Sequence, residues 1–160
     1  MVRTSASFIL EELAVVVGDA CDHFGKEIKE TSLVKAEILK IESMAFVFWF
    51  FQKSQVFSEP HRKLILDEVH SQYYDIFKKC GYDFEKRQRL CDEFNIRYQA
   101  YNKAFGSDQD LTKVAVQFCR FLSEKSRAEL SGADLKIPLY LVERLSSKFV
   151  EWKNVFSSYD

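Results

Sequence analysis

The histidines and their neighbouring carboxylates are the residues best suited to chemistry, because imidazole ligates metals and transfers protons near neutral pH. Asp19 precedes His23 by four positions, and Asp67 precedes His70 by three. Both spacings place a pair on one face of a helix. The candidate metal ligands are therefore His23, His70, Asp19 and Asp67. The helical period puts His70 at the edge of an apolar stripe and Asp67 towards solvent.

A complete metal centre of the kind found in helical bundles requires more ligands than these four. A carboxylate-bridged di-iron site typically uses two Glu-x-x-His pairs and two further glutamates. The chain offers one analogue, Asp67-x-x-His70. We therefore expect local side-chain pairs at these positions and no cofactor. The alternative is a metal-dependent enzyme that uses bundle histidines and carboxylates.

A second carboxylate pair, Glu37 and Glu42, flanks the expected apolar seam of the second helix, about 60° to either side of its centre. Paired carboxylates act as general acid and base when a cleft holds them apart. Glutamates beside a bundle seam more often stay in water near lysines, and we expect that here. The chain carries no nucleophile elbow, phosphate-binding loop or deaminase zinc signature. No catalytic motif is found.

Charge and aromatic placement argue against a nucleic-acid partner. The formal net charge is −1, which provides no long-range field to attract phosphate backbones. The densest basic cluster, at residues 86–89, lies beside Glu85, Asp92 and Glu93 and is typical of a solvated helix face. Tyr98 and Tyr101 fall on the apolar stripe of their helix, so we expect them in the core rather than stacked on bases.

Cysteine usage and hydropathy indicate the compartment. The four cysteines, at positions 21, 80, 91 and 119, form no CxxC pair, which predicts reduced thiols. No apolar run reaches the ~18 residues that span a bilayer. Glu11 and Glu12 interrupt the apolar run at residues 8–17, where a signal peptide would need continuity. We expect a cytoplasmic location and no membrane partner.

Apolar residues recur at spacings of three and four along the whole chain, which is typical of amphipathic helices. The first stripe runs from Leu10 to Phe24, and Gly18 and Gly25 predict a bend or break after Ala20. Capping signals divide the remaining segments. The expected boundary residues are Thr31 or Ser32 for the second helix, Ser58, Pro60 and Gly81 for the third, Asp83 and Gly106 for the fourth, Asp108 for the fifth and Pro138 for the sixth, with a loop at residues 131–134.

These segments predict an all-α fold with residues 1–160 forming a single helical domain. Scarce glycine and proline argue against all-β folds, and the short connections favour antiparallel neighbours. The expected architecture is a bundle of five to six mostly antiparallel helices, with the second helix, at about residues 32–56, in the centre.

The central position follows from residues 44–51, MAFVFWFF, which are apolar on every face of a helix. A helix of this kind must be surrounded. Ala45 and Phe48 belong to the expected seam, whereas Phe46, Val47 and Phe50 lie on the opposite side. Other helices, a second copy of the chain or an apolar ligand would each satisfy them. The three residues are thus the candidate interface or pocket residues.

The sequence supports three functional hypotheses. The leading one is a cytoplasmic helical-bundle protein that acts by protein–protein interaction, with itself as partner in a homodimer. The second is a small apolar-ligand-binding protein with a pocket along the second helix. The third is the metal-dependent enzyme described above. No motif decides among them.

Overall fold

In a computed structural model of the chain, residues 2–31, 36–54, 56–59, 61–126 and 135–156 are described. These ranges fold into six helices and contain no strand. The all-α fold is confirmed. The helices, in chain order, are α1 (Val2–Thr31), α2 (Ala36–Lys53), α3 (His61–Lys79), α4 (Phe84–Phe105), α5 (Leu111–Ser126) and α6 (Lys136–Phe156).

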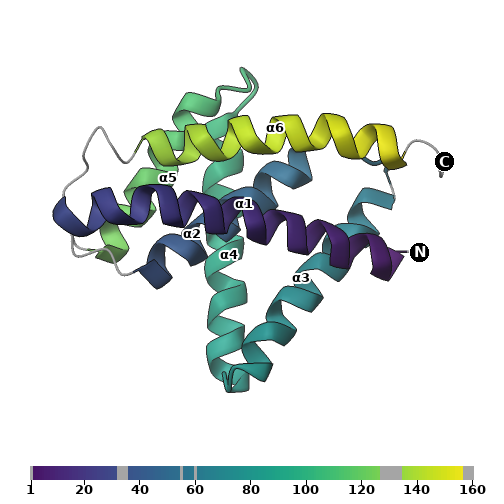
Figure 1. The fold of residues 1–160 in the computed structure, drawn as a ribbon, viewed down its shortest axis with the longest axis horizontal. Helices are drawn as coiled ribbons and strands as arrows, with labels where there is room; N and C mark the ends of the chain where they lie inside the picture. Colours follow the sequence, from purple (N-terminus) through teal and green to yellow (C-terminus); the bar gives the residue numbers. More distant parts are fainter. Residues whose placement is uncertain (1, 32–35, 55, 60, 127–134, 157–160) are drawn as a thin grey trace.

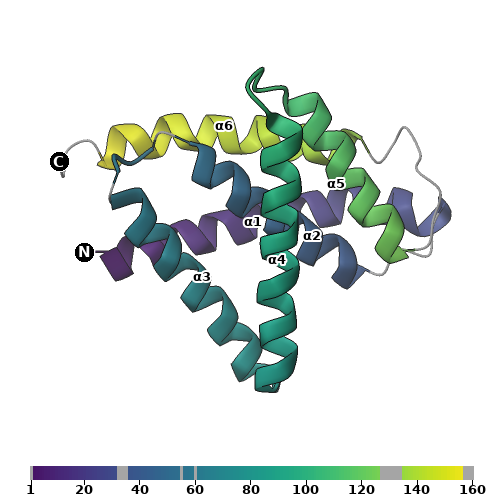
Figure 2. The ribbon, with the colours of Figure 1, turned by 180° about the vertical axis from the view of Figure 1, so that it is seen from behind.

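Helix α2 is the centre of the bundle, as the sequence predicts. It contacts each of the other five helices. Helices α1 and α6 run side by side on one face of the molecule, and α4 and α5 lie on the opposite face (Figures 1 and 2). Because α2 lies between these layers, its all-round apolar segment is buried on every side.

The candidate interface residues on α2 are part of this core. Phe46 and Val47 are fully buried within the chain, and Phe50 is half-buried against the core. The Phe46 ring packs edge-to-face against Tyr101 of α4 and Phe118 of α5, at centroid distances of 5.7 Å and 5.4 Å. Phe50 contacts Phe149 of α6 at 5.4 Å. The three apolar side chains are therefore covered by other helices of the same chain.

Helix α1 continues through the glycines that predicted a break. It runs unbroken from Val2 to Thr31, and a Cβ at Gly18 would meet no atom within 4 Å. The expectation of a break after Ala20 is therefore wrong, whereas the alternative of a bend stays a prediction. Packing explains the difference, since α1 contacts α2, α3 and α6 along its length. Such tertiary contacts outweigh the modest intrinsic cost of a helical glycine.

The helix ends agree with most of the expected caps. Gly81 ends α3 with a positive φ of 85°, and the Tyr82 N–H donates to the Phe77 carbonyl. Asp83 caps α4 by accepting a hydrogen bond from the Lys86 N–H at 2.8 Å. The fifth helix differs, because Asp110 rather than Asp108 accepts from the N–H of Thr112 in its first turn.

Several expected boundaries fall elsewhere. Pro138 lies in the first turn of α6, which begins two residues earlier. Thr31 belongs to the end of α1. The expected cap at Ser32, Pro60 and the loop at residues 131–134 lie outside the described residues.

The α3–α4 hairpin extends away from the other helices. Figure 1 shows the two helices diverging from the turn near Gly81 towards the rest of the bundle. All four cysteines lie in the described ranges, and none of them forms a disulfide bond there. None of the helices in the described ranges combines the length and apolar character required to cross a bilayer.

Candidate ligand-binding groove

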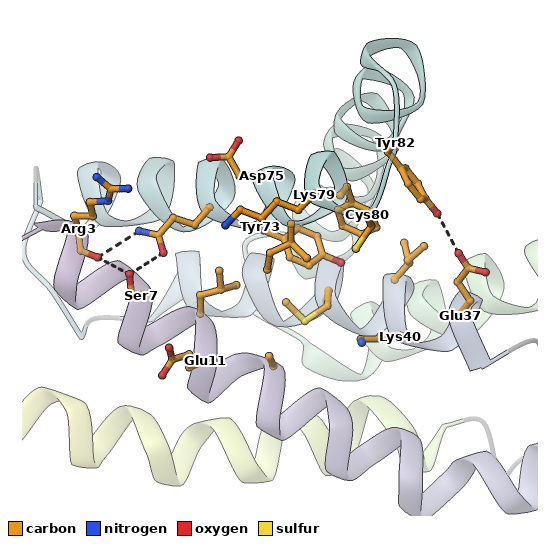
Figure 3. Close-up of a pocket in the computed structure, with 17 residues that line it drawn as sticks. Arg3, Ser7, Glu11, Glu37, Lys40, Tyr73, Asp75, Lys79, Cys80 and Tyr82 are labelled. Atoms are coloured by element: carbon orange, nitrogen blue, oxygen red, sulfur yellow. Dashed lines mark hydrogen bonds between the residues drawn. The ribbon is translucent and has the colours of Figure 1, made fainter.

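A groove lies where α1, α2 and α3 meet. It has a volume of about 650 Å³ and is open to solvent along one side (Figure 3). Ligand sites in proteins commonly have volumes of about 300–1,000 Å³. The groove follows the first half of α2, between Glu37 and Met44, and is walled by α1 and α3.

The floor of the groove is apolar. Leu10 and Met44 are almost fully buried beneath it, while Ile76 is 46 % exposed at its edge. An aliphatic side chain so exposed beside a cavity offers apolar area that a ligand would cover. The apolar lining residues are Leu10, Ala14, Ile41, Met44, Ile76 and Phe77.

Hydrogen bonds connect the walls at both ends of the groove. At one end, the Tyr82 hydroxyl donates to Glu37 Oε1 at 3.1 Å and links the α3–α4 turn to α2. This hydrogen bond is the main cause of a raised pKa for the Tyr82 hydroxyl. At the other end, Gln72 Nε2 donates to the Arg3 carbonyl at 3.3 Å, and Gln72 Oε1 lies 2.9 Å from Ser7 Oγ. The groove is thus bridged from the α3–α4 turn to α2 at one end and from α3 to α1 at the other.

The groove is lined by three basic side chains, those of Arg3, Lys40 and Lys79. Lys40 comes from α2 and Lys79 from the last turn of α3. Figure 3 shows the Lys79 side chain running along α3, whereas the Asp75 carboxylate points away from the groove on the outer side of that helix. Among the side chains that the structure describes, a set that excludes residues 26–36, no carboxylate oxygen lies within 4.0 Å of the Lys40 or Lys79 ammonium group.

Comparison of the chain with protein-family models, with curated proteins and with solved structures gives no significant match. The function of the groove must therefore be argued from its own geometry.

The candidate metal ligands on α3 are engaged in other contacts. His70 Nδ1 lies 2.8 Å from the Leu66 carbonyl, which can only accept, so Nδ1 carries the proton. His70 Nε2 then accepts from the Tyr98 hydroxyl at 2.5 Å. Burial lowers the pKa of His70, which keeps the imidazole neutral. Asp67 is exposed, as the helical period predicts.

The candidate ligands on α1 lie beside α6. The His23 ring stacks on Tyr140 with a centroid distance of 5.6 Å, and Asp19 pairs with Arg144 at 3.9 Å. Within the described part of the chain, no three or more histidine, cysteine, aspartate or glutamate side chains are grouped to hold a metal ion. The metal-dependent enzyme stays a prediction that this arrangement does not favour.

Glu37 and Glu42 do not form an acid–base pair. Glu37 is exposed at the end of the groove, as expected, but Glu42 is only 2 % exposed. Glu42 accepts two hydrogen bonds from Arg97 of α4, from Nε at 2.9 Å and from Nη2 at 2.5 Å. The Arg97 guanidinium also lies over the Phe121 ring, 4.6 Å from its centroid. The expectation that Glu42 stays in water is therefore wrong.

The groove itself was not foreseen from the sequence. The expected pocket lay beside residues 46–50, whereas the groove lies beside residues 37–44 of the same helix. One feature of the sequence is consistent with the groove. Ile76 continues the apolar stripe of α3, yet its side chain is 46 % exposed in the structure. Only the divergence of α1 and α3 turns that stripe into a cavity wall.

Proposed function

We propose that this protein binds a small amphipathic ligand in the groove between α1, α2 and α3. The observation that carries the proposal is a cavity of about 650 Å³ with an apolar floor and an aliphatic residue, Ile76, left 46 % exposed at its edge. The side chains that line it are polar at the rim and apolar at the base, which suits a ligand with both characters. The proposal corresponds to the apolar-ligand hypothesis, with the pocket moved towards the start of α2.

The structure removes the original basis for the homodimer hypothesis. That hypothesis depended on Phe46, Val47 and Phe50 as an uncovered surface, and two of these residues are fully buried while the third packs on α6. Protein–protein interaction and homodimerisation stay predictions that no contact in the described chain supports. Ligand binding is the function that the geometry favours.

A chain-length series of neutral n-alkanols tests the proposal. Burial of one methylene contributes about 0.8 kcal/mol, so each added carbon should tighten binding about fourfold until the groove is full. Calorimetric titration below the micellar concentration measures this trend. An affinity that does not depend on chain length would contradict the proposal.

A matched pair of variants locates the binding. Ala14 is an exposed residue that lines the groove, whereas its neighbour Val15 is 56 % exposed outside it. Ala14→Trp should fill the cavity and abolish alkanol binding, while Val15→Trp should leave the affinity unchanged. Both substitutions leave buried side chains intact, and thermal denaturation checks that both variants fold. Equal affinities for the two variants would place any binding elsewhere on the molecule.

A further inference from the structure

The charged side chains that line the groove are balanced in sign on each wall. Helices α1, α2 and α3 each contribute one basic and one acidic residue to the part of the lining that the structure describes. These residues are Arg3 and Glu11 on α1, Glu37 and Lys40 on α2, and Asp75 and Lys79 on α3. Their formal charges therefore cancel, both over the described lining and within each wall.

The balance persists when the residues that are directed elsewhere are set aside. Arg3 lies 3.9 Å from Glu68, and Figure 3 shows the Asp75 carboxylate on the outer side of α3. Two basic and two acidic side chains remain, all of them exposed: Lys40, Lys79, Glu11 and Glu37. The two lysine ammonium groups lie well apart in Figure 3. A charged molecule in the groove therefore meets attraction and repulsion together, and neither dominates.

One face of α2 changes from polar to apolar along the groove. Lys40, Ile41 and Met44 lie three, four and seven positions after Glu37, which is the spacing of a single helix face. All four residues line the groove. A molecule that lies along this face meets a carboxylate and an ammonium group first and apolar surface afterwards.

A hydroxyl group can use both signs of charge at the polar end. It donates one hydrogen bond to a carboxylate and accepts from an ammonium group. Glu37 accepts from Tyr82 through Oε1, and a carboxylate has lone pairs for further donors. A hydroxyl group also loses less hydration energy on binding than a carboxylate or an ammonium ion does.

We infer that the ligand of the groove is an uncharged amphiphile with a hydroxyl headgroup, an aliphatic alcohol. Its hydroxyl group lies between Glu37 and Lys40, and its alkyl chain follows Ile41 and Met44 along the apolar floor. This assignment rests on the proposed function and specifies its ligand.

Three probes of equal chain length separate the charge of the ligand from its apolar area: octanol, octanoate and octylammonium. Calorimetry at neutral pH and low salt should give octanol at least about threefold tighter binding than either ion, because the ions lose more hydration. The two ions should bind within about twofold of each other, since the charges of the lining cancel. Added salt should change the affinity for octanol little.

Methyl heptyl ether tests the hydroxyl group, because it is an isomer of octanol that accepts a hydrogen bond but cannot donate one. It should bind about three- to tenfold more weakly than octanol, which is the usual effect of one lost hydrogen bond. The double variant Glu37→Ala with Lys40→Ala should bind octanol and the ether equally. Lys78→Ala with Glu85→Ala is the matched control, since both residues are exposed and neither lines the groove. It should retain the preference for octanol.

The outcomes distinguish the alcohol ligand from the proposed function. A preference for either ion over octanol, or equal affinities of the wild type for octanol and the ether, would overturn the alcohol and leave ligand binding in place. A preference for octanol over the ether that survives in the Glu37→Ala, Lys40→Ala variant would overturn the position given to the hydroxyl group. Failure of all four probes to bind would overturn the proposed function itself.

Discussion

Arg97 on α4 donates to both carboxylate oxygens of Glu42 on α2, and both side chains are almost completely buried. The pair connects the central helix to the α3–α4 hairpin, whose other helix forms a wall of the groove. A planar guanidinium that meets a carboxylate through two hydrogen bonds fixes orientation as well as distance. The ion pair therefore helps to set the position of α4 relative to α2.

Removal of one member of this ion pair should destabilise the fold much more than removal of both. Arg97→Ala leaves the Glu42 carboxylate buried without a counter-ion, and we expect it to lower the free energy of unfolding by about 3–5 kcal/mol. Replacement of both residues, Glu42→Leu with Arg97→Met, should recover a large part of that loss. Urea denaturation of Glu42→Leu, Arg97→Met and the double variant measures the coupling.

An exposed ion pair provides the comparison. Arg89 and Glu85 of α4 lie 3.7 Å apart with both side chains largely in solvent. Arg89→Ala should change stability little, because water and salt screen such pairs. If Arg97→Ala proved as mild as Arg89→Ala, the structural role assigned to the buried pair would be wrong.

The stability of the fold should depend on the protonation of His70. Burial lowers the His70 pKa in the folded state, whereas the unfolded chain titrates near its ordinary value of 6.5. The unfolded state therefore binds more protons below about pH 6.5, and stability falls as the pH is lowered through that value until the folded-state pKa is reached. The slope attributable to His70 is at most about 1.4 kcal/mol per pH unit.

Denaturation of the wild type and of His70→Gln between pH 7.5 and pH 5 measures this contribution, over a range of about one to two units on either side of 6.5. The variant should show the shallower dependence. A variant with the wild-type slope would show that the acid sensitivity arises at other groups.

Two glycines should respond to alanine in opposite directions. Gly81 has a φ of 85°, which an alanine adopts only with strain, so Gly81→Ala should cost about 1–2 kcal/mol. Gly18 lies inside α1 with open space where an alanine methyl group would stand, so Gly18→Ala should stabilise by about 0.5–1 kcal/mol. Thermal denaturation of both variants should give shifts of opposite sign, and shifts of the same sign would contradict these local conformations.

Phe50 tests whether the apolar segment of α2 serves the fold or an interface. Its ring packs on Phe149 and on Phe46, so Phe50→Glu should destabilise the folded chain by about 1–3 kcal/mol through lost apolar contact. Light scattering coupled to size-exclusion chromatography should give the same mass for the folded variant as for the wild type. A dimeric wild type that becomes monomeric in the variant would instead restore the homodimer hypothesis.

The fold was largely predictable because its determinants are local or compositional. The periodic apolar stripes predict five to six helices, Gly81 and Asp83 predict the α3–α4 turn, and the eight apolar residues from Met44 predict the central position of α2. Each inference needed the neighbouring residues alone. Asp108 and Asp110 show the limit of such reasoning. Both are suitable cap residues two positions apart, and the sequence alone does not decide which of them caps α5.

The site was far less predictable because it depends on pairs that are distant in the sequence. Glu42 and Arg97 are 55 residues apart, and each alone is typical of a solvated helix face. The groove likewise requires α1 and α3 to diverge, and the residues of one helix do not determine the distance between two other helices. Ile76 hints at the cavity only when the residues opposite it are known.

The most direct test of ligand binding in the groove is a nuclear magnetic resonance titration of the labelled protein with dodecanol, with the methyl signals of Ile41, Met44 and Ile76 as reporters. The proposed groove predicts saturable shifts at these three methyl-bearing residues, and none at Val150, which is exposed elsewhere on α6. The absence of saturable shifts at Ile41, Met44 and Ile76, or shifts of equal size at Val150, would contradict it.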